Sequence, residues 1–350
     1  ALYGANAFNG ILFMTTRNPF DEQGVSFYLK SGLTMQKAAG DNNFYDFGIR
    51  LAHAFSEKFA AKASFSYLKG TDWYANDTNE YSNANTSVGE PDDVLALRSS
   101  PAHDGINIYG DEVCLGALGT NLNEVGLSLE AMGLIPAGSS ALLPAVDVSR
   151  TGYREQDVTD YDAGNGKADI SFHYRPTGGD FEIEWNSKFG WGRTIYQGAN
   201  RYQLDNFLMQ SHKIELRNKD FFIRGYNISE TAGNSYDMRF TGINMNKYRA
   251  QEWFGAYAGG YLGAVLGGAT DAQAHAGARI IADDAETLQP GTAEFDQLYN
   301  QVISDPDVNT GSKFVDNTQV TVGEGNYNFS RLLNNVLDFQ VGGDYRQYSL

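Results

Sequence analysis

Residues 24–70 alternate strictly between apolar and polar side chains, with a tight turn at 56–58. Because alternate residues of a strand point to opposite faces, this pattern predicts three consecutive strands with one apolar face and one polar face. The first two strands place these side chains on the apolar face: Val25, Phe27, Leu29, Leu33, Met35, Tyr45, Phe47, Ile49, Leu51, His53 and Phe55.

The same alternation recurs later and brings the expected number of strands to about nine. The further strands are expected near 167–175, 181–192, 206–217, 221–228, 314–329 and 336–350. Within 181–192 aromatic and acidic residues alternate, and both cannot be buried in one environment, so one face must be apolar and the other wet.

The connections between these strands also form a pattern. Those at 56–58, 176–180, 217–220 and 330–335 are short and fall on one rim, and those at 38–42, 72–163, 198–205 and 231–313 fall on the other. Short turns on one rim and long loops on the other are typical of transmembrane β-barrels. We therefore predict an all-β fold, part of a large transmembrane antiparallel barrel, with outer loops at about 72–163 and 231–313.

Short helices are expected inside the second outer loop, over 252–268, 271–285 and 292–303, the last capped by Thr292. The glycines spaced every four residues in the first of these resemble a membrane-helix contact face, but the stretch is too short to span. A spanning helix needs roughly 20 apolar residues, and no such run occurs.

The net charge and the absence of catalytic motifs limit the classes of function that fit the sequence. The chain has 26 Lys and Arg against 43 Asp and Glu, a net charge of −17, which argues against a nucleic-acid partner. The five histidines lack metal-ligand spacing, and no nucleophile, phosphate-binding or paired-carboxylate motif occurs. We expect no enzyme activity, cofactor or metal site. The single Cys114 cannot form an internal disulfide, and packing within a loop is its expected role.

Two acidic stretches have simple explanations. Residues 160–166 resemble a calcium loop, but the twelfth position lacks the glutamate that such a loop requires, so a turn that enters a strand is favoured. Asp111 and Glu112 are expected to be solvated.

The first residues resemble a known family. Tyr3, Gly4, Ala7, Gly10, Ile11, Thr15, Thr16 and Arg17 resemble the last plug strand of TonB-dependent outer-membrane receptors, with conservative departures at Ile11, Leu12, Met14 and Arg17. The stretches 230–236 and 278–292 resemble the branch that carries a carboxypeptidase-regulatory-like domain. The resemblance implies that 1–19 ends a plug domain and that 20–350 forms the first part of a 22-stranded barrel.

What the resemblance implies about function is active uptake of a nutrient across the outer membrane. The implied partners are TonB and its inner-membrane motor, reached through a segment before residue 1, an extracellular lipoprotein lid in some members, and outer-membrane lipid or lipopolysaccharide. Aromatic residues at the outer strand ends serve either as an interface belt or as ligand contacts. The candidate ligand contacts are Trp73, Tyr74, Tyr196, Tyr202 and Trp253.

Two other functions fit the same pattern. One is an outer-membrane scaffold or assembly component, in which a receptor-like barrel has lost transport. The other is a soluble all-β binding protein, such as a sandwich, which needs a second sheet to cover its apolar face. Nine strands in lipid would leave two unpaired edges, so we expect the chain to be an interior piece of a longer one.

Overall fold

The computed structural model describes residues 15–79, 100–112 and 119–349. Tyr3, Gly4, Ala7 and Gly10 of the expected plug-end motif lie outside the described residues, as does Cys114. Thr15 and Thr16 of that motif are described, and they lie in irregular backbone.

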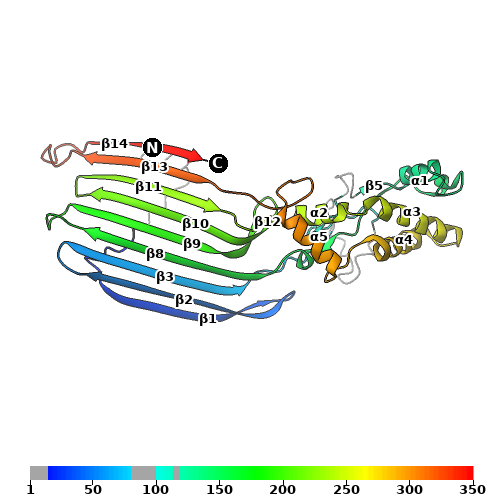
Figure 1. The fold of residues 1–350 in the computed structure, drawn as a ribbon, viewed down its shortest axis with the longest axis horizontal. Coiled ribbons are helices and arrows are strands. Elements are labelled where there is room, and N and C mark those ends of the chain that lie inside the picture. Colours follow the sequence, from blue (N-terminus) through cyan, green and yellow to red (C-terminus); the bar gives the residue numbers. More distant parts are fainter. Residues whose placement is uncertain (1–14, 80–99, 113–118, 350) are drawn as a thin grey trace.

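One large antiparallel sheet dominates the molecule (Figure 1). Its long strands follow chain order: β1 (Gly24–Gln36), β2 (Gly40–Ala54), β3 (Phe59–Thr71), β8 (Asp162–Tyr174), β9 (Glu182–Gln197), β10 (Arg201–Arg217), β11 (Phe221–Thr231), β13 (Gln319–Asn328) and β14 (Gln340–Ser349). Each strand pairs with its neighbour, and a short strand, β12 (Tyr236–Asp237), pairs with β10. The nine strands expected from the alternation are confirmed, and the sheet is open, with β1 and β14 at its edges.

The register keeps the two faces of the sheet distinct from strand to strand. Ile49 of β2 lies opposite Phe27 of β1 and Phe65 of β3, so the apolar face is continuous across them. We call this side the apolar face and the opposite side the polar face. The apolar side chains lie against one another along the sheet, as Phe172 and Trp185 do with ring centroids 5.4 Å apart.

The apolar face is uncovered. Phe27 is 80% exposed and Leu29 is 74% exposed, although both are large hydrophobic residues. Among the described residues no second sheet packs on this face; the two other sheets have two short strands each and belong to the loops. The sandwich arrangement is therefore not found in the described chain.

The two ends of the sheet differ, as the connections predict. The turns at 56–58, 176–180, 217–220 and 330–335 lie at one end, which we call the turn end. The two long connections fold at the other, which we call the helical end, beside the short connections between β1 and β2 and between β9 and β10 (Figure 1). The helical end contains α1 (Leu122–Ala131), α2 (Met238–Lys247), α3 (Ala250–Leu266), α4 (Asp271–Glu286), α5 (Ala293–Ser304), the 3-10 turns η4 (Ser139–Leu142) and η5 (Glu155–Asp157), and the strands β4 (Ile108–Tyr109), β5 (Gly119–Asn121), β6 (Asp147–Ser149) and β7 (Tyr153–Arg154). In the described part of the chain, no helix combines the length and apolar character that crossing a membrane demands.

Three of these helices were expected from the sequence. The helices α3, α4 and α5 match the stretches 252–268, 271–285 and 292–303, and the Thr292 side chain caps α5 by accepting a hydrogen bond from the amide of Phe295. The helices α1 and α2 and the short strands of the first outer loop were not expected, because their sequences show no sustained periodicity.

The helical end has its own hydrophobic core, and Trp253 lies in it. Trp253 is fully buried, its indole Nε1 donates to Asp283 Oδ1 at 2.9 Å, and the guanidinium groups of Arg150 and Arg279 lie 5.6 and 5.7 Å from its ring centroid. These contacts leave the indole no surface for a ligand. Trp253 is therefore a packing residue, and we drop it as a ligand contact.

The two acidic expectations have opposite outcomes. Asp160 and Asp162 form an Asx turn that enters β8, as expected, because the Asp162 amide donates to Asp160 Oδ1 at 2.7 Å. The prediction that Asp111 and Glu112 are solvated was wrong, since both side chains are buried. Glu112 pairs with Arg239 Nε at 3.0 Å and Asp111 accepts from the Gly105 amide, so tertiary partners replace water.

Candidate functional site on the polar face

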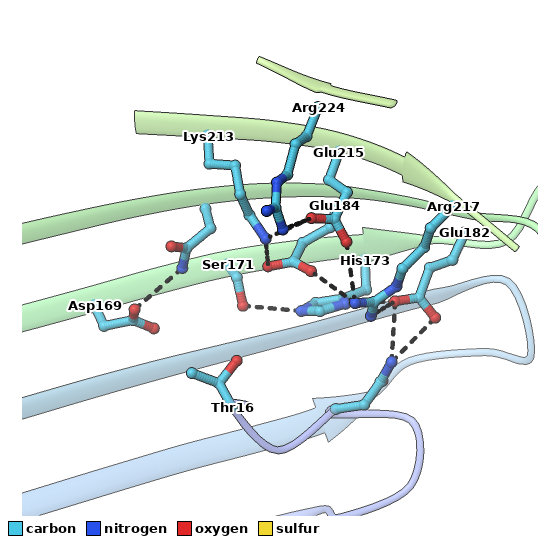
Figure 2. A network of polar contacts seen from close by, with 12 residues as sticks. Thr16, Asp169, Ser171, His173, Glu182, Glu184, Lys213, Glu215, Arg217 and Arg224 are labelled. Atoms are coloured by element: carbon cyan, nitrogen blue, oxygen red, sulfur yellow. Dashed lines mark hydrogen bonds and ion pairs between the residues drawn. The ribbon is translucent and has the colours of Figure 1, made fainter. Parts of the chain in front are cut away.

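Buried charged residues gather on the polar face near the turn end of the sheet (Figure 2). They come from consecutive positions of the alternation on four neighbouring strands, so the register alone brings them together. The strands β8 and β9 place His173 opposite Glu184, and β9 and β10 place Glu184 opposite Glu215. The next strand, β11, places Arg224 opposite Glu215.

Glu182 is the most connected acid of this group and is 2% exposed. Its carboxylate accepts from His173 Nδ1 at 3.0 Å, from Arg175 at 2.8 Å and from Arg217 Nη2 at 2.7 Å. A carboxylate only accepts hydrogen bonds, so Nδ1 of His173 carries a proton, and Nε2 lies 3.0 Å from the Ser171 hydroxyl. The imidazole is therefore held in one orientation from both sides.

Two further acids extend the network across the sheet. Lys213 Nζ lies 3.2 Å from Glu184 and 3.2 Å from Glu215, and it bridges the two carboxylates. Arg217 reaches both as well, at 3.6 Å to Glu184 and 3.2 Å to Glu215. Arg224 lies 3.6 Å from Glu215 and 2.5 Å from Glu324 on β13, so the charges form one chain from β8 to β13.

These acids are neutralised as a group. Three buried carboxylates face four cations, Arg175, Lys213, Arg217 and Arg224, each of which is at least one quarter exposed. Burying ions costs several kcal/mol each unless partners compensate them, and removing one partner of such a set typically costs 3–5 kcal/mol. The network therefore fixes the spacing of these strands at the turn end.

We considered a metal ion at this place, because the ligand atoms of His173, Glu182 and Glu184 lie within 4.8 Å of one another. The expectation from sequence was that no metal site exists. The donor set argues for ion pairs instead: arginine or lysine side chains already occupy both carboxylates, and Nδ1 of His173 donates to one of them. A metal would have to displace these cations.

The segment that precedes β1 is attached to the polar face. Asn18 Nδ2 donates to both carboxylate oxygens of Glu182, at 2.9 and 3.1 Å. Lys62 Nζ, buried on β3, donates to Thr16 Oγ1 and to the carbonyl oxygen of Arg17, both at 2.9 Å. Thr16 thus lies over the polar face beside the ion network (Figure 2). Thr16 and Arg17, at the described end of the stretch that resembles a plug end, are in contact with the sheet at this point.

The other aromatic candidates lie at the helical end of the strands. Tyr196 and Tyr202 are directly opposed on β9 and β10, with ring centroids 6.1 Å apart. Tyr74 stacks on Tyr161 at 3.6 Å between centroids. Trp73 is 63% exposed, and its carbonyl oxygen accepts from Arg201. The structure therefore brings Tyr196 and Tyr202 together and leaves Trp73 exposed, while Tyr74 belongs to a separate stack.

A buried acid joins these aromatic residues to the loops. Glu155 accepts from the hydroxyls of Tyr109 and Tyr161 at 2.8 and 2.9 Å, and it forms an ion pair with Arg201 Nε at 2.5 Å. Burial and the adjacent carboxylate raise the pKa of both tyrosines, so both hydroxyls keep their protons and act as donors. The first outer loop is thereby held to the start of β10.

Sequence reasoning missed the network around Glu182. Its histidine and acids were judged by spacings typical of helices and metal loops, whereas their contacts cross strands. The available signal was the turn at 176–180: residues on both sides of a short turn pair, so His173 and Glu182 are brought to neighbouring strands. Asn18 and Glu182 are 164 residues apart in the sequence, so no local pattern predicts their contact.

No family model, no curated protein and no solved structure matches this chain.

Proposed function

We propose that this chain forms part of a TonB-dependent outer-membrane transporter, in which the sheet is a section of barrel wall and residues before β1 end a plug. The observation that carries the proposal is the contrast between the faces of one sheet. Large apolar side chains are uncovered along one face, whereas the other face buries three neutralised carboxylates. Lipid suits the first face and a water-filled or protein-filled lumen suits the second.

Two further features support the proposal. The edges β1 and β14 present unpaired backbone groups, and each such group costs several kcal/mol in lipid, so further strands would have to close the wall. The segment at 15–18 approaches the polar face and hydrogen bonds to it, which is where a plug would join its barrel. The folded helical end would then face outward and receive the ligand, with Tyr196 and Tyr202 beneath it.

The proposal is tested with the full-length gene. Fractionation of cells should place the protein in the outer membrane, and its band should shift on heating in detergent gels, as closed barrels do. A deletion strain should then grow more slowly on the transported nutrient, and a plasmid copy should restore growth. Outer-membrane location without a growth defect on any nutrient tested would favour the scaffold alternative. A soluble protein would overturn both.

A further inference from the structure

The cations of the polar face fall into two groups that differ in their partners. Near the turn end, Arg175, Lys213, Arg217 and Arg224 all pair with buried carboxylates. The second group lies on the same face, beside the first, and extends away from the turn end. It consists of Arg50, Lys62, Lys167 and Lys188, and we call it the basic patch.

The basic patch lines a cavity of about 880 Å³ above the polar face. Asp169 is the only acid among the described residues that line it, against these four cations. In the described part of the chain none of the four forms an ion pair: Lys62 donates to Thr16 and to the Arg17 carbonyl, and Arg50 donates to the Glu22 carbonyl. Arg17, which also lines the cavity, pairs with Glu22 at 2.7 Å.

This imbalance is unusual within the molecule, which carries a net charge of −17. Lys167 and Lys188 are exposed in the cavity, on neighbouring strands and on the same face as Lys62. Lys188 lies directly opposite Asp169 in the strand register, and this one carboxylate cannot neutralise all four cations. The like charges that remain repel each other, and an anionic partner would remove the repulsion. Residues 1–14, which precede Thr15 in the sequence, contain no acidic residue and cannot supply that charge.

From this geometry we infer that the basic patch docks a polypeptide surface that bears carboxylate side chains. A polypeptide is favoured over a small anion because peptide already occupies the cavity wall: Thr15, Thr16 and Arg17 line it, and Lys62 binds their backbone and side-chain oxygens. The inference rests on the proposed function, since the docked surface would belong to the body that fills the barrel. Beyond the proposed function, the inference states that the docked surface is acidic and names Lys167 and Lys188 as the lysines that contact it.

A carbodiimide cross-linking experiment tests this directly. The reagent joins an amine and a carboxylate only when they are in ion-pair contact, and mass spectrometry of the full-length protein in its membrane identifies each linked pair. Lys213 with Glu215, at 3.2 Å, and Lys30 with Asp46, at 3.3 Å, should cross-link and serve as positive controls. Lys58, an exposed turn residue, should not.

We expect Lys167 and Lys188 to cross-link to Asp or Glu residues that lie outside this sheet, about as efficiently as Lys213. Lys167→Arg with Lys188→Arg keeps both charges but removes the amines, and it should abolish these two links without changing the controls. If the controls cross-link and neither lysine links to a residue outside this sheet, the occupant is water or a small anion, and the inference is overturned; a link of Lys188 to Asp169, which lies opposite it, counts as such a failure. Cell fractionation is scored separately, so failure of the transporter proposal is recognised independently.

Discussion

At the residue scale, Glu182 is the position on which most contacts of the polar face converge. It binds Arg175 just after β8, Arg217 at the end of β10, the imidazole of His173, and Asn18 from the segment before β1. One carboxylate therefore ties β8, β9 and β10 to that segment. Its contacts therefore position these parts of the chain relative to one another.

Glu182→Gln should destabilise the folded protein by about 3–5 kcal/mol, because the amide leaves Arg175 and Arg217 without their shared anion. Urea unfolding of the refolded full-length protein measures this. Glu57→Gln, in the exposed turn between β2 and β3, is the matched control and should change stability by less than about 0.5 kcal/mol. Equal effects of the two substitutions would show that the network does not hold the strands.

Glu112 gives a prediction about pH. Burial raises the pKa of its carboxyl above the usual value, despite the ion pair with Arg239. A raised folded-state pKa means that the folded state holds the proton more tightly than the unfolded state does. Its contribution to stability is therefore complete below the unfolded pKa, near 4.5, and is lost as the pH rises through the higher folded value.

We therefore expect the helical end to become less stable on going from pH 4.5 toward neutral, and Glu112→Gln to flatten part of this slope. Hydrogen exchange of the amides of α2, which carries Arg239, at several pH values measures the effect. Glu57→Gln again serves as control and should keep the wild-type slope. An unchanged slope in Glu112→Gln would contradict the assignment.

At the scale of the element, a strand has to satisfy both faces at once. Leu29 points to the apolar face of β1 and is 74% exposed, while Thr34 of the same strand points to the polar face. If lipid covers the apolar face, Leu29→Arg should cost about 2–4 kcal/mol and Thr34→Arg much less. The yield of heat-modifiable barrel in the outer membrane measures both. Equal yields would argue against lipid contact.

The pair of helices α3 and α4 provides a second test at this scale. A Cβ added to Gly260 would lie 3.1 Å from the Ala278 backbone, whereas a Cβ added to Gly259 meets nothing within 4 Å. Gly259→Ala should therefore stabilise α3 by up to about 1 kcal/mol, because alanine favours helices. Gly260→Ala should lose that gain or destabilise the pair. Hydrogen exchange in α4 compares them, and identical protection in both variants would contradict this packing.

How much the sequence predicted depends on the range of the interaction. Strand alternation and the Thr292 cap are local, and they located nine strands and three helices. The burial of Glu112 and Trp253 could not be predicted, because partners 127 and 30 residues away, Arg239 and Asp283, decide it. The cross-strand contacts of His173 could have been predicted, since a short turn fixes which residues of the two strands pair.

At the scale of the whole molecule, the sheet has a direction. The turns at 56–58, 176–180, 217–220 and 330–335 lie at one end and the described helices at the other, so the two ends cannot exchange places in an asymmetric membrane (Figure 1). In the proposed transporter the helical end lies outside the cell and the turn end in the periplasm. Glu57 in the turn between β2 and β3 and Asp284 on α4 are exposed at the two ends.

Single cysteines at these two positions test the direction, in a Cys114→Ser background that removes the native thiol. A membrane-impermeant maleimide added to intact cells should label Asp284→Cys and leave Glu57→Cys unlabelled, because the outer membrane separates the reagent from the turn end. After the outer membrane is permeabilised, both should label to a similar extent, which controls for thiol reactivity. Labelling of Glu57→Cys alone in intact cells would invert the orientation, and equal labelling of both would exclude a wall that separates the two ends of the sheet.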